Sequence, residues 1–398
     1  MYEAFSYTKS TRLVFIDVLR GLAIVLMALD HTREYFGAFP FDALDLTKTN
    51  SALFFTRFIS HLCAPIFVFL SGVSVWLYRK KRKLNARQLS AFLSKRGAWL
   101  IVIEVTVVNF SWFFAYPLLV LQVIWVIGVS MLILSLLVFC PRWVVASFAV
   151  LSIALHNLAD GISPSSLGAF DWLWIILHVH GSIPTPGLPF AQIDVIYPLI
   201  PWVGVMVAGY VLAPLLVFDD GRKNWNSWYM ASFCLVAFIL LRGFHGYGEP
   251  GFFPSHNGKF LVARGPLYTT MAFLNTTKYP PSLQFLLLTL GLFFLAIPLA
   301  KRAHGTIAGT LSTLGRVPFF FYVLHLPLIH FCSMLWVYTS FGQWDGPLFT
   351  HSNWPADIHA SLLRVYIVWI GIVVSLLPLC TWYARFKRSH RYWWLSYL

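Results

Sequence analysis

Long apolar blocks alternate with short polar connections along almost the whole chain. Many of these blocks are about twenty residues long, which is the length of helix that crosses the ~30 Å hydrocarbon core of a bilayer. The pattern predicts an all-α polytopic membrane protein with a single transmembrane domain over residues 1–398. We expect about ten spans, at about 13–31, 53–78, 97–115, 118–139, 143–158, 195–218, 227–241, 282–300, 314–340 and 360–384.

The composition supports this interpretation. Of the 398 residues, 58% are hydrophobic and only 11% are charged, and the mean hydropathy is +0.71. Soluble domains carry about a quarter charged residues, so a large water-soluble domain is excluded. No small-residue cleavage site follows the first apolar block, and we therefore expect this block to be retained as a span rather than removed as a signal peptide.

The formal net charge of +14 is concentrated in the connections on one side of the predicted spans. The strongest cluster is the basic run Arg79–Lys83. Because basic residues favour the cytoplasmic side of a membrane, the distribution predicts that both termini are cytoplasmic. We interpret the run as a topology anchor against anionic lipid, so the expected partner is membrane lipid and not nucleic acid.

Two connections on the predicted outer side are long. Residues 159–194 are rich in Gly, Pro and Trp and include the apolar stretch 170–181, which is too short to cross and is expected to be interfacial or re-entrant. Residues 242–281 mix aromatic, glycine and basic residues. Either segment could cap a substrate site or form ordered surface. The two halves of the chain show no clear similarity, which weakens a transporter interpretation.

The first span carries Asp17, Arg20 and His31. Each charged residue inside a span costs about 2.5–3.5 kcal/mol on insertion scales. Arg20 and His31 are separated by three helical turns plus about 20°, so they share one face and lie roughly 16 Å apart along the axis. Asp17 lies one turn before Arg20, within pairing distance. The residues are either a neutralised structural pair with an interfacial histidine or a functional polar track, and their cost favours function.

Other histidines in the apolar blocks are candidates too. His61 lies about two turns from the outer end of the second span, where a structural role and a site role are equally consistent with the sequence. In the ninth span His325 and His330 are five residues apart and therefore point in different directions, and we expect His325 to face the bundle. The pair His178 and His180 is a weak metal pattern, and no metal site is expected.

Arg20 and His31, with ten residues between them inside a stretch that begins Asp-Val-Leu-Arg-Gly-Leu-Ala, resemble the first span of a family of integral-membrane acyltransferases. These enzymes move acetyl groups from cytoplasmic acetyl-CoA to acceptors outside. The chain looks most like the bacterial relatives of lysosomal heparan-α-glucosaminide N-acetyltransferase. Supporting stretches are LCAPIFVFLSGVS at 62–74, VIYPLIPWVGVMVAGYVL at 195–212, NTTKYPPSLQFLLLTLG at 275–291 and PFFFYVLHLPLIH at 318–330.

This resemblance implies a transferase that uses acetyl-CoA or another acyl-CoA as co-substrate. It would modify a hydroxyl or amine on an outward-facing glycan or lipid, from the bacterial inner (plasma) membrane. Arg20 is expected to bind phosphate or pantetheine oxygen, with Asp17 and His325 completing the cofactor-binding set. His31 is expected to act as the general base that deprotonates the acceptor.

The sequence departs from the family pattern at one point. The lysosomal enzyme has its catalytic histidine in the loop after the first span, whereas residues 32–60 contain no histidine here. His31, with His61 as a helper, is therefore expected to take the catalytic role.

Further expectations concern the acceptor and the alternatives to an enzyme. Lys278 and Asn275 are expected to contact the acceptor or the thioester oxygen. The alternative function is a transporter or flippase that uses Asp17, Arg20 and His31 as a proton or anion pathway. A third possibility is a non-catalytic partner of an envelope-polysaccharide system.

Overall fold

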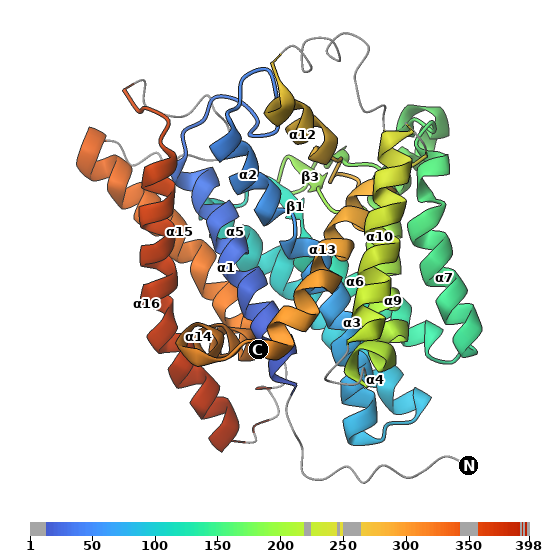
Figure 1. Ribbon diagram of the computed structural model, residues 1–398. Coiled ribbons are helices and arrows are strands. Elements are labelled where there is room, and N and C mark those ends of the chain that lie inside the picture. The colour runs from blue at the N-terminus through green and yellow to red at the C-terminus, as the bar shows by residue number, and fades with distance from the viewer. Residues whose placement is uncertain are drawn as a thin grey trace.

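The computed structural model describes residues 13–218, 224–244, 247–249, 264–342, 357–390, 392 and 395. Its long helices run side by side as a bundle, with α12 and a small sheet near one end and α14 near the other (Figure 1). Residues 1–12 and 396–398, at the two chain ends that were predicted to be cytoplasmic, lie outside the described residues.

The helical elements are α1 (Val14–Phe36), α2 (Ser51–Ser60), α3 (Cys63–Arg82), α4 (Ala86–Ile103), the π-helix η1 (Glu104–Val108), α5 (Asn109–Phe113), α6 (Val123–Leu137), α7 (Arg142–Ala154), the 3₁₀ helices η2 (His156–Ala159) and η3 (Pro164–Phe170), α8 (Asp171–Leu177), α9 (Leu199–Val217), α10 (Trp225–Gly243), α12 (Pro266–Leu274), α13 (Leu283–Arg302), α14 (Gly305–Arg316), α15 (Pro318–Phe341) and α16 (Leu362–Ser389). The strands are β1 (Leu119–Leu121), β2 (Gly181–Pro184) and β3 (Gln192–Val195).

The predicted class, a helical membrane protein, is confirmed, and each of the predicted spans contains at least one helix. Five helical segments of the described chain are long and apolar enough to cross a bilayer: Ser51–Arg82, Leu199–Val217, Leu283–Arg302, Pro318–Phe341 and Leu362–Ser389. Helix α1 is also long, at 23 residues, but it carries charges and lies inside the bundle. The number of spans and the orientation of the ends stay predictions.

Some predicted spans begin in structure other than the helix that fills them. The span predicted at 118–139 begins with strand β1, and helix α6 starts only at Val123. The span predicted at 314–340 joins two helices, because Val317 leaves helical geometry (φ −130°, ψ 49°) between α14 and α15. Val317 precedes Pro318, whose ring disfavours the α conformation in the residue before it.

A three-stranded sheet in the order β1-β3-β2 fastens the long segment 159–194 to the bundle. Strand β1 pairs in parallel with β3, and β2 pairs antiparallel with β3. The apolar stretch 170–181 forms mainly α8, whose seven residues are too few to cross a membrane. Ile175 of α8 packs with Val195 of β3 in a small separate core.

Glycines allow two pairs of helices to approach until their backbones touch. A Cβ atom on Gly21 of α1 would lie 1.9 Å from the carbonyl oxygen of Leu311, and one on Gly315 of α14 would lie 1.8 Å from that of Asp17. Gly72 of α3 gives α9 the same close approach. Small residues commonly permit such contacts in membrane bundles. Helix α14 therefore holds α1 at the turn that carries Asp17 and Gly21.

The other end of α1 is held by α16. The last carbonyl groups of a helix have no partner within the helix itself. Here Arg364 Nε donates to the carbonyl oxygen of Phe36 at 2.7 Å, and the backbone N–H of Ser361 donates to that of Gly37 at 3.1 Å. Contacts at both ends thus fix α1, the helix with the candidate catalytic residues.

Candidate active site

The predicted pair of Asp17 and Arg20 is present on α1. Nη1 of Arg20 lies 3.6 Å from Oδ1 of Asp17, and Nη2 donates to the hydroxyl of Ser74 on α3. Asp17 is buried, whereas Arg20 is partly exposed. The carboxylate and the hydroxyl orient the guanidinium between two helices, and its permanent charge suits it to bind an anion.

His31 of α1 is hydrogen-bonded to His325 of α15. Nδ1 of His31 lies 2.8 Å from Nε2 of His325, whose own Nδ1 lies 2.7 Å from the carbonyl oxygen of Tyr322. His330 points elsewhere, with its Nδ1 3.1 Å from the carbonyl oxygen of Ser111. The sequence interval of five residues thus gives these two histidines of α15 different neighbours.

The chain of hydrogen bonds determines which ring nitrogens carry protons. A carbonyl oxygen can only accept, so the nitrogen of His325 that faces Tyr322 must be the protonated one. The other nitrogen of a neutral His325 is then an acceptor, and Nδ1 of His31 must donate to it. Nε2 of a neutral His31 therefore keeps its lone pair, which is what a general base needs.

An aromatic wall, formed by Trp112 and Tyr35, packs beside the His31 ring. The Trp112 ring meets the His31 ring edge-on, with centroids 4.9 Å apart. Tyr35 stacks on Trp112 at 5.8 Å and donates its hydroxyl to the Trp112 carbonyl oxygen at 2.6 Å. Both wall residues are buried, while His31 is partly exposed. The His31 ring is thus held by His325 and Trp112 and remains accessible to a substrate.

A charged cluster centred on Asp30, which the sequence pattern does not reveal, lies next to His31. The two carboxylate oxygens of Asp30 lie 2.6 and 2.5 Å from Nη1 of Arg57 on α2. Arg33 and Ser60 also donate to this carboxylate, at 3.1 and 2.8 Å. Asp30 and Arg57 each lie inside a predicted span, but the sequence does not show that they pair. The cluster fixes α2 against α1 one residue away from His31.

Lys278 lies close to this cluster. Only 7% of the residue is exposed, and it lies in the turn between α12 and α13, where its backbone forms an isolated antiparallel β-bridge with Pro281. Its ammonium nitrogen is 5.0 Å from the centre of the Tyr279 ring. It is near enough to Asp30 and His31 to interact electrostatically with both. The fold therefore brings Lys278 to the neighbourhood of His31, although more than 200 residues separate them in the chain.

Asn275 and His61 occupy other surroundings. The side-chain amide of Asn275 donates to the carbonyl oxygen of Leu44 at 3.2 Å, which ties the Lys278 turn to the segment after α1. His61 is buried in the turn between α2 and α3, with its ring 5.7 Å from that of Phe285. Within the described part of the chain, its Nε2 has no hydrogen-bond partner. Among the described residues, neither side chain is hydrogen-bonded to His31.

His178 and His180, the pair that forms a weak metal pattern in the sequence, have different neighbours. Nε2 of His178 lies 3.1 Å from Oδ1 of Asp160, while the ring of His180 lies 6.1 Å from that of Tyr279. Burial lowers the pKa of His178, and Asp160 opposes this shift. Among the described residues, no three His, Cys, Asp or Glu side chains gather in a way that could hold a metal ion.

Comparison with known proteins links the first part of this geometry to a family. A family model described as heparan-alpha-glucosaminide N-acetyltransferase, catalytic, matches residues 12–246, which is more than half of the chain. The matched region includes Asp17, Arg20 and His31, whereas Lys278 and His325 lie beyond its end. No curated protein matches the chain.

Proposed function

The chain belongs to the heparan-α-glucosaminide N-acetyltransferase family, and from this premise we propose that it transfers an acyl group from a cytoplasmic acyl-CoA to an acceptor across the membrane. The donor is acetyl-CoA or a related thioester, and the acceptor is a hydroxyl or amine on an outward-facing glycan or lipid. The hydrogen bond from His31 to His325 is the observation that carries the proposal, because it leaves a basic nitrogen on the helix that also bears Arg20.

Arg20 is the anchor for the donor in this proposal. Its forked donors suit a phosphate or a pantetheine oxygen, and Asp17 and Ser74 hold it in position. Eleven helical rises separate Arg20 from His31, or roughly 16 Å. This spacing suits an extended pantetheine arm that carries the thioester from the anchor to the base.

His31 performs the proton transfer. Its Nε2 removes the proton from the acceptor as the acceptor oxygen or nitrogen attacks the thioester carbonyl carbon. The carbon–sulfur bond then breaks, and the CoA thiolate leaves and takes the proton from His31. While His31 is protonated, His325 accepts the hydrogen bond from its Nδ1–H and stabilises the imidazolium.

Residues from the second part of the chain complete the proposed site. Lys278 contacts the acceptor or the thioester oxygen, where a positive charge would stabilise the developing negative charge. Asn275 positions the turn that carries Lys278. His61, which is buried between α2 and α3, assists His31 in this proposal. We place the enzyme in the bacterial inner membrane, in accordance with the outward acceptor.

The proposal can be tested with inside-out membrane vesicles, whose cytoplasmic face is accessible. Radiolabelled acetyl-CoA is supplied, and the label in the glycan and lipid fractions is counted together with the CoA released. We expect label in one of these fractions and an equal amount of free CoA. The transporter alternative predicts flux through liposomes that does not require acyl-CoA, and this result would contradict the proposal.

Replacing Arg20 with alanine is expected to weaken acyl-CoA binding about 10- to 100-fold, because a charge-assisted hydrogen bond contributes about 1.5–3 kcal/mol. Binding of acetyl-CoA to the purified protein measures the effect. Arg87→Ala is the matched control, since Arg87 is an exposed arginine near the start of α4. Equal affinity of the Arg20→Ala variant and the wild type would remove Arg20 from the donor site.

His325 was expected to belong to the cofactor-binding set, but its bond to His31 favours a role in orienting the base, and substitutions test this role. His325→Leu removes the acceptor of the His31 Nδ1 proton, and turnover is expected to fall about 10- to 100-fold. His325→Gln is expected to recover part of this loss, because an amide can accept from His31 and donate to the Tyr322 carbonyl oxygen. The affinity for acetyl-CoA should stay unchanged in both variants. If Gln were no better than Leu, a purely structural role of His325 would follow.

A further inference from the structure

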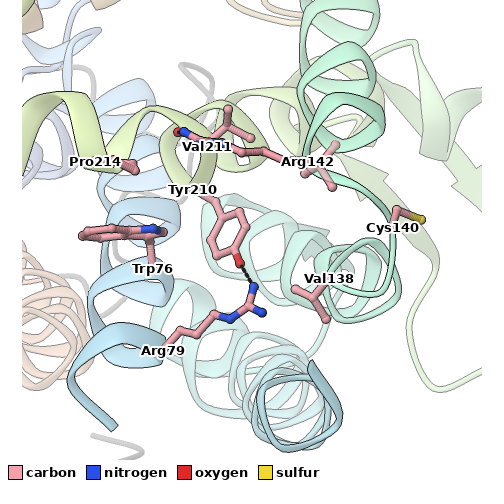
Figure 2. Close-up of a pocket in the computed structure, with 9 residues that line it drawn as sticks. Trp76, Arg79, Val138, Cys140, Arg142, Tyr210, Val211 and Pro214 are labelled. Atoms are coloured by element: carbon pink, nitrogen blue, oxygen red, sulfur yellow. Dashed lines mark hydrogen bonds between the residues drawn. The ribbon is translucent and has the colours of Figure 1, made fainter. Parts of the chain in front are cut away.

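A cavity of 310 Å³ lies among α3, α6, α7 and α9, apart from the candidate active site (Figure 2). Among its lining residues are Trp76, Arg79, Arg142, Tyr210 and Val211. No residue of α1 lines it. Trp76 and Arg79 are displaced from Ser74, the partner of Arg20, by about 200° and 140° around α3. The cavity therefore lies on another side of α3 than Arg20.

Two arginines give this cavity a positive charge. Nη1 of Arg79 donates to the hydroxyl of Tyr210 at 2.6 Å, and the two side chains meet inside the ring of lining residues (Figure 2). Nη2 of Arg142 lies 3.3 Å from the carbonyl oxygen of Val211. Among the described residues, neither arginine has a carboxylate partner and no Asp or Glu lines the cavity. Two guanidinium groups without a carboxylate in the described lining, beside apolar walls, favour an anion.

An exposed aromatic rim, formed by Phe139, Trp143 and Phe218, borders the cavity. These residues are 54%, 71% and 52% exposed. The first two adjoin lining residues in the chain, and Phe218 packs edge-on against Trp76 with ring centroids 5.7 Å apart. Aromatic side chains are enriched at the boundary between the headgroups and the hydrocarbon of a bilayer. The cavity thus lies where a membrane protein meets lipid headgroups.

The basic run Arg79–Lys83 places the cavity on the side predicted to be cytoplasmic, where anionic lipid accumulates. The ammonium nitrogen of Lys80 lies 4.5 Å from the centre of the Phe218 ring, so a third positive charge borders the rim. A volume of 310 Å³ is at the lower end of the range of about 300–1,000 Å³ that is usual for ligand pockets. It has room for a phosphate headgroup, whereas acyl chains would lie along the apolar surface outside.

We propose that this cavity binds the phosphate headgroup of an anionic phospholipid, with Arg79 and Arg142 as its ligands. The guanidinium groups donate to the phosphate oxygens, because arginine matches phosphate with paired hydrogen bonds. Tyr210 orients Arg79, and Trp76 covers the headgroup beside the rim. This site does not depend on the acyl transfer proposed above.

The test uses the full chain, purified in detergent and titrated with phosphatidylglycerol or phosphatidylcholine. Native mass spectrometry counts the bound lipid molecules. The wild type is expected to retain phosphatidylglycerol in preference to phosphatidylcholine. The double variant Arg79→Gln/Arg142→Gln is expected to bind phosphatidylglycerol at least about tenfold more weakly, since each arginine contributes charge-assisted hydrogen bonds. Arg87→Gln, which removes an exposed arginine outside the cavity, should bind as the wild type does.

Two outcomes would overturn the proposal. One is equal retention of phosphatidylglycerol by the double variant and the wild type. The other is competition by CoA for the site, with CoA binding lost in the double variant, which would assign the cavity to the donor. Should the double variant fail to fold, Arg142→Gln alone serves, because Arg142 is exposed and its bond within the described chain is to a single carbonyl oxygen.

Discussion

Replacing His31 with alanine is expected to lower the turnover of acyl transfer by about 10²–10⁴-fold, the usual contribution of a general base. The affinity for acetyl-CoA should stay near that of the wild type, because Arg20 holds the donor three helical turns away. The measurement is acetyl transfer from labelled acetyl-CoA in inside-out vesicles, with binding followed separately on the purified protein.

His304→Ala is the control for this experiment, since His304 is an exposed histidine before α14. It should transfer acetyl groups at the wild-type rate. A His31→Ala variant with normal turnover would show that another residue deprotonates the acceptor. A variant that lost acetyl-CoA binding together with turnover would place His31 in the donor site instead.

Replacing Arg57 with alanine is expected to lower the free energy of unfolding by about 1.5–3 kcal/mol, the usual contribution of a hydrogen bond to a charged group, since the pair with Asp30 is only partly buried. The change leaves the Asp30 carboxylate without its main partner between α1 and α2. The thermal midpoint of the protein in lipid nanodiscs measures this loss. We also expect reduced turnover, because the same cluster positions the helix turn that carries His31.

The double variant Asp30→Ala/Arg57→Ala distinguishes the pair from its members. Because neither charge is then left unpaired, its loss of stability should be smaller than the sum of the two single losses. Arg87→Ala, on the surface of α4, should unfold at the wild-type temperature. Additive losses in the double variant would contradict a direct coupling between Asp30 and Arg57.

The helical bundle could be predicted from the sequence because a long apolar block has few alternatives to a helix in a membrane. Helix α14 could not be predicted as a separate helix, because its apolar residues continue toward Pro318 and the hydropathy shows no boundary at Val317. The sheet was missed for a related reason. Strand β1 has three residues, and its partner β3 lies far along the chain, so neither strand is long enough for a period of two to be recognised.

The site was predictable only within a single helix. The pairing of Asp17 with Arg20 follows from their spacing of three residues. The bond between His31 and His325 joins residues 294 positions apart. A helical pattern indicates that a side chain faces the bundle, but not which helix it meets. The pairing of Asp30 with Arg57 was missed for the same reason.

Arg20 and His31 are carried by one helix, and α14 and α16 hold its two ends. Their separation is set by the number of helical rises between them and does not change when one helix slides against another. In the proposed reaction α1 therefore fixes the distance between the residue that binds the donor and the base. Every acyl-CoA has the same pantetheine arm, so this fixed distance does not distinguish one acyl-CoA from another. Selection among acyl chains then falls to the residues beyond the thioester, first of all to Trp112 and Tyr35 beside His31.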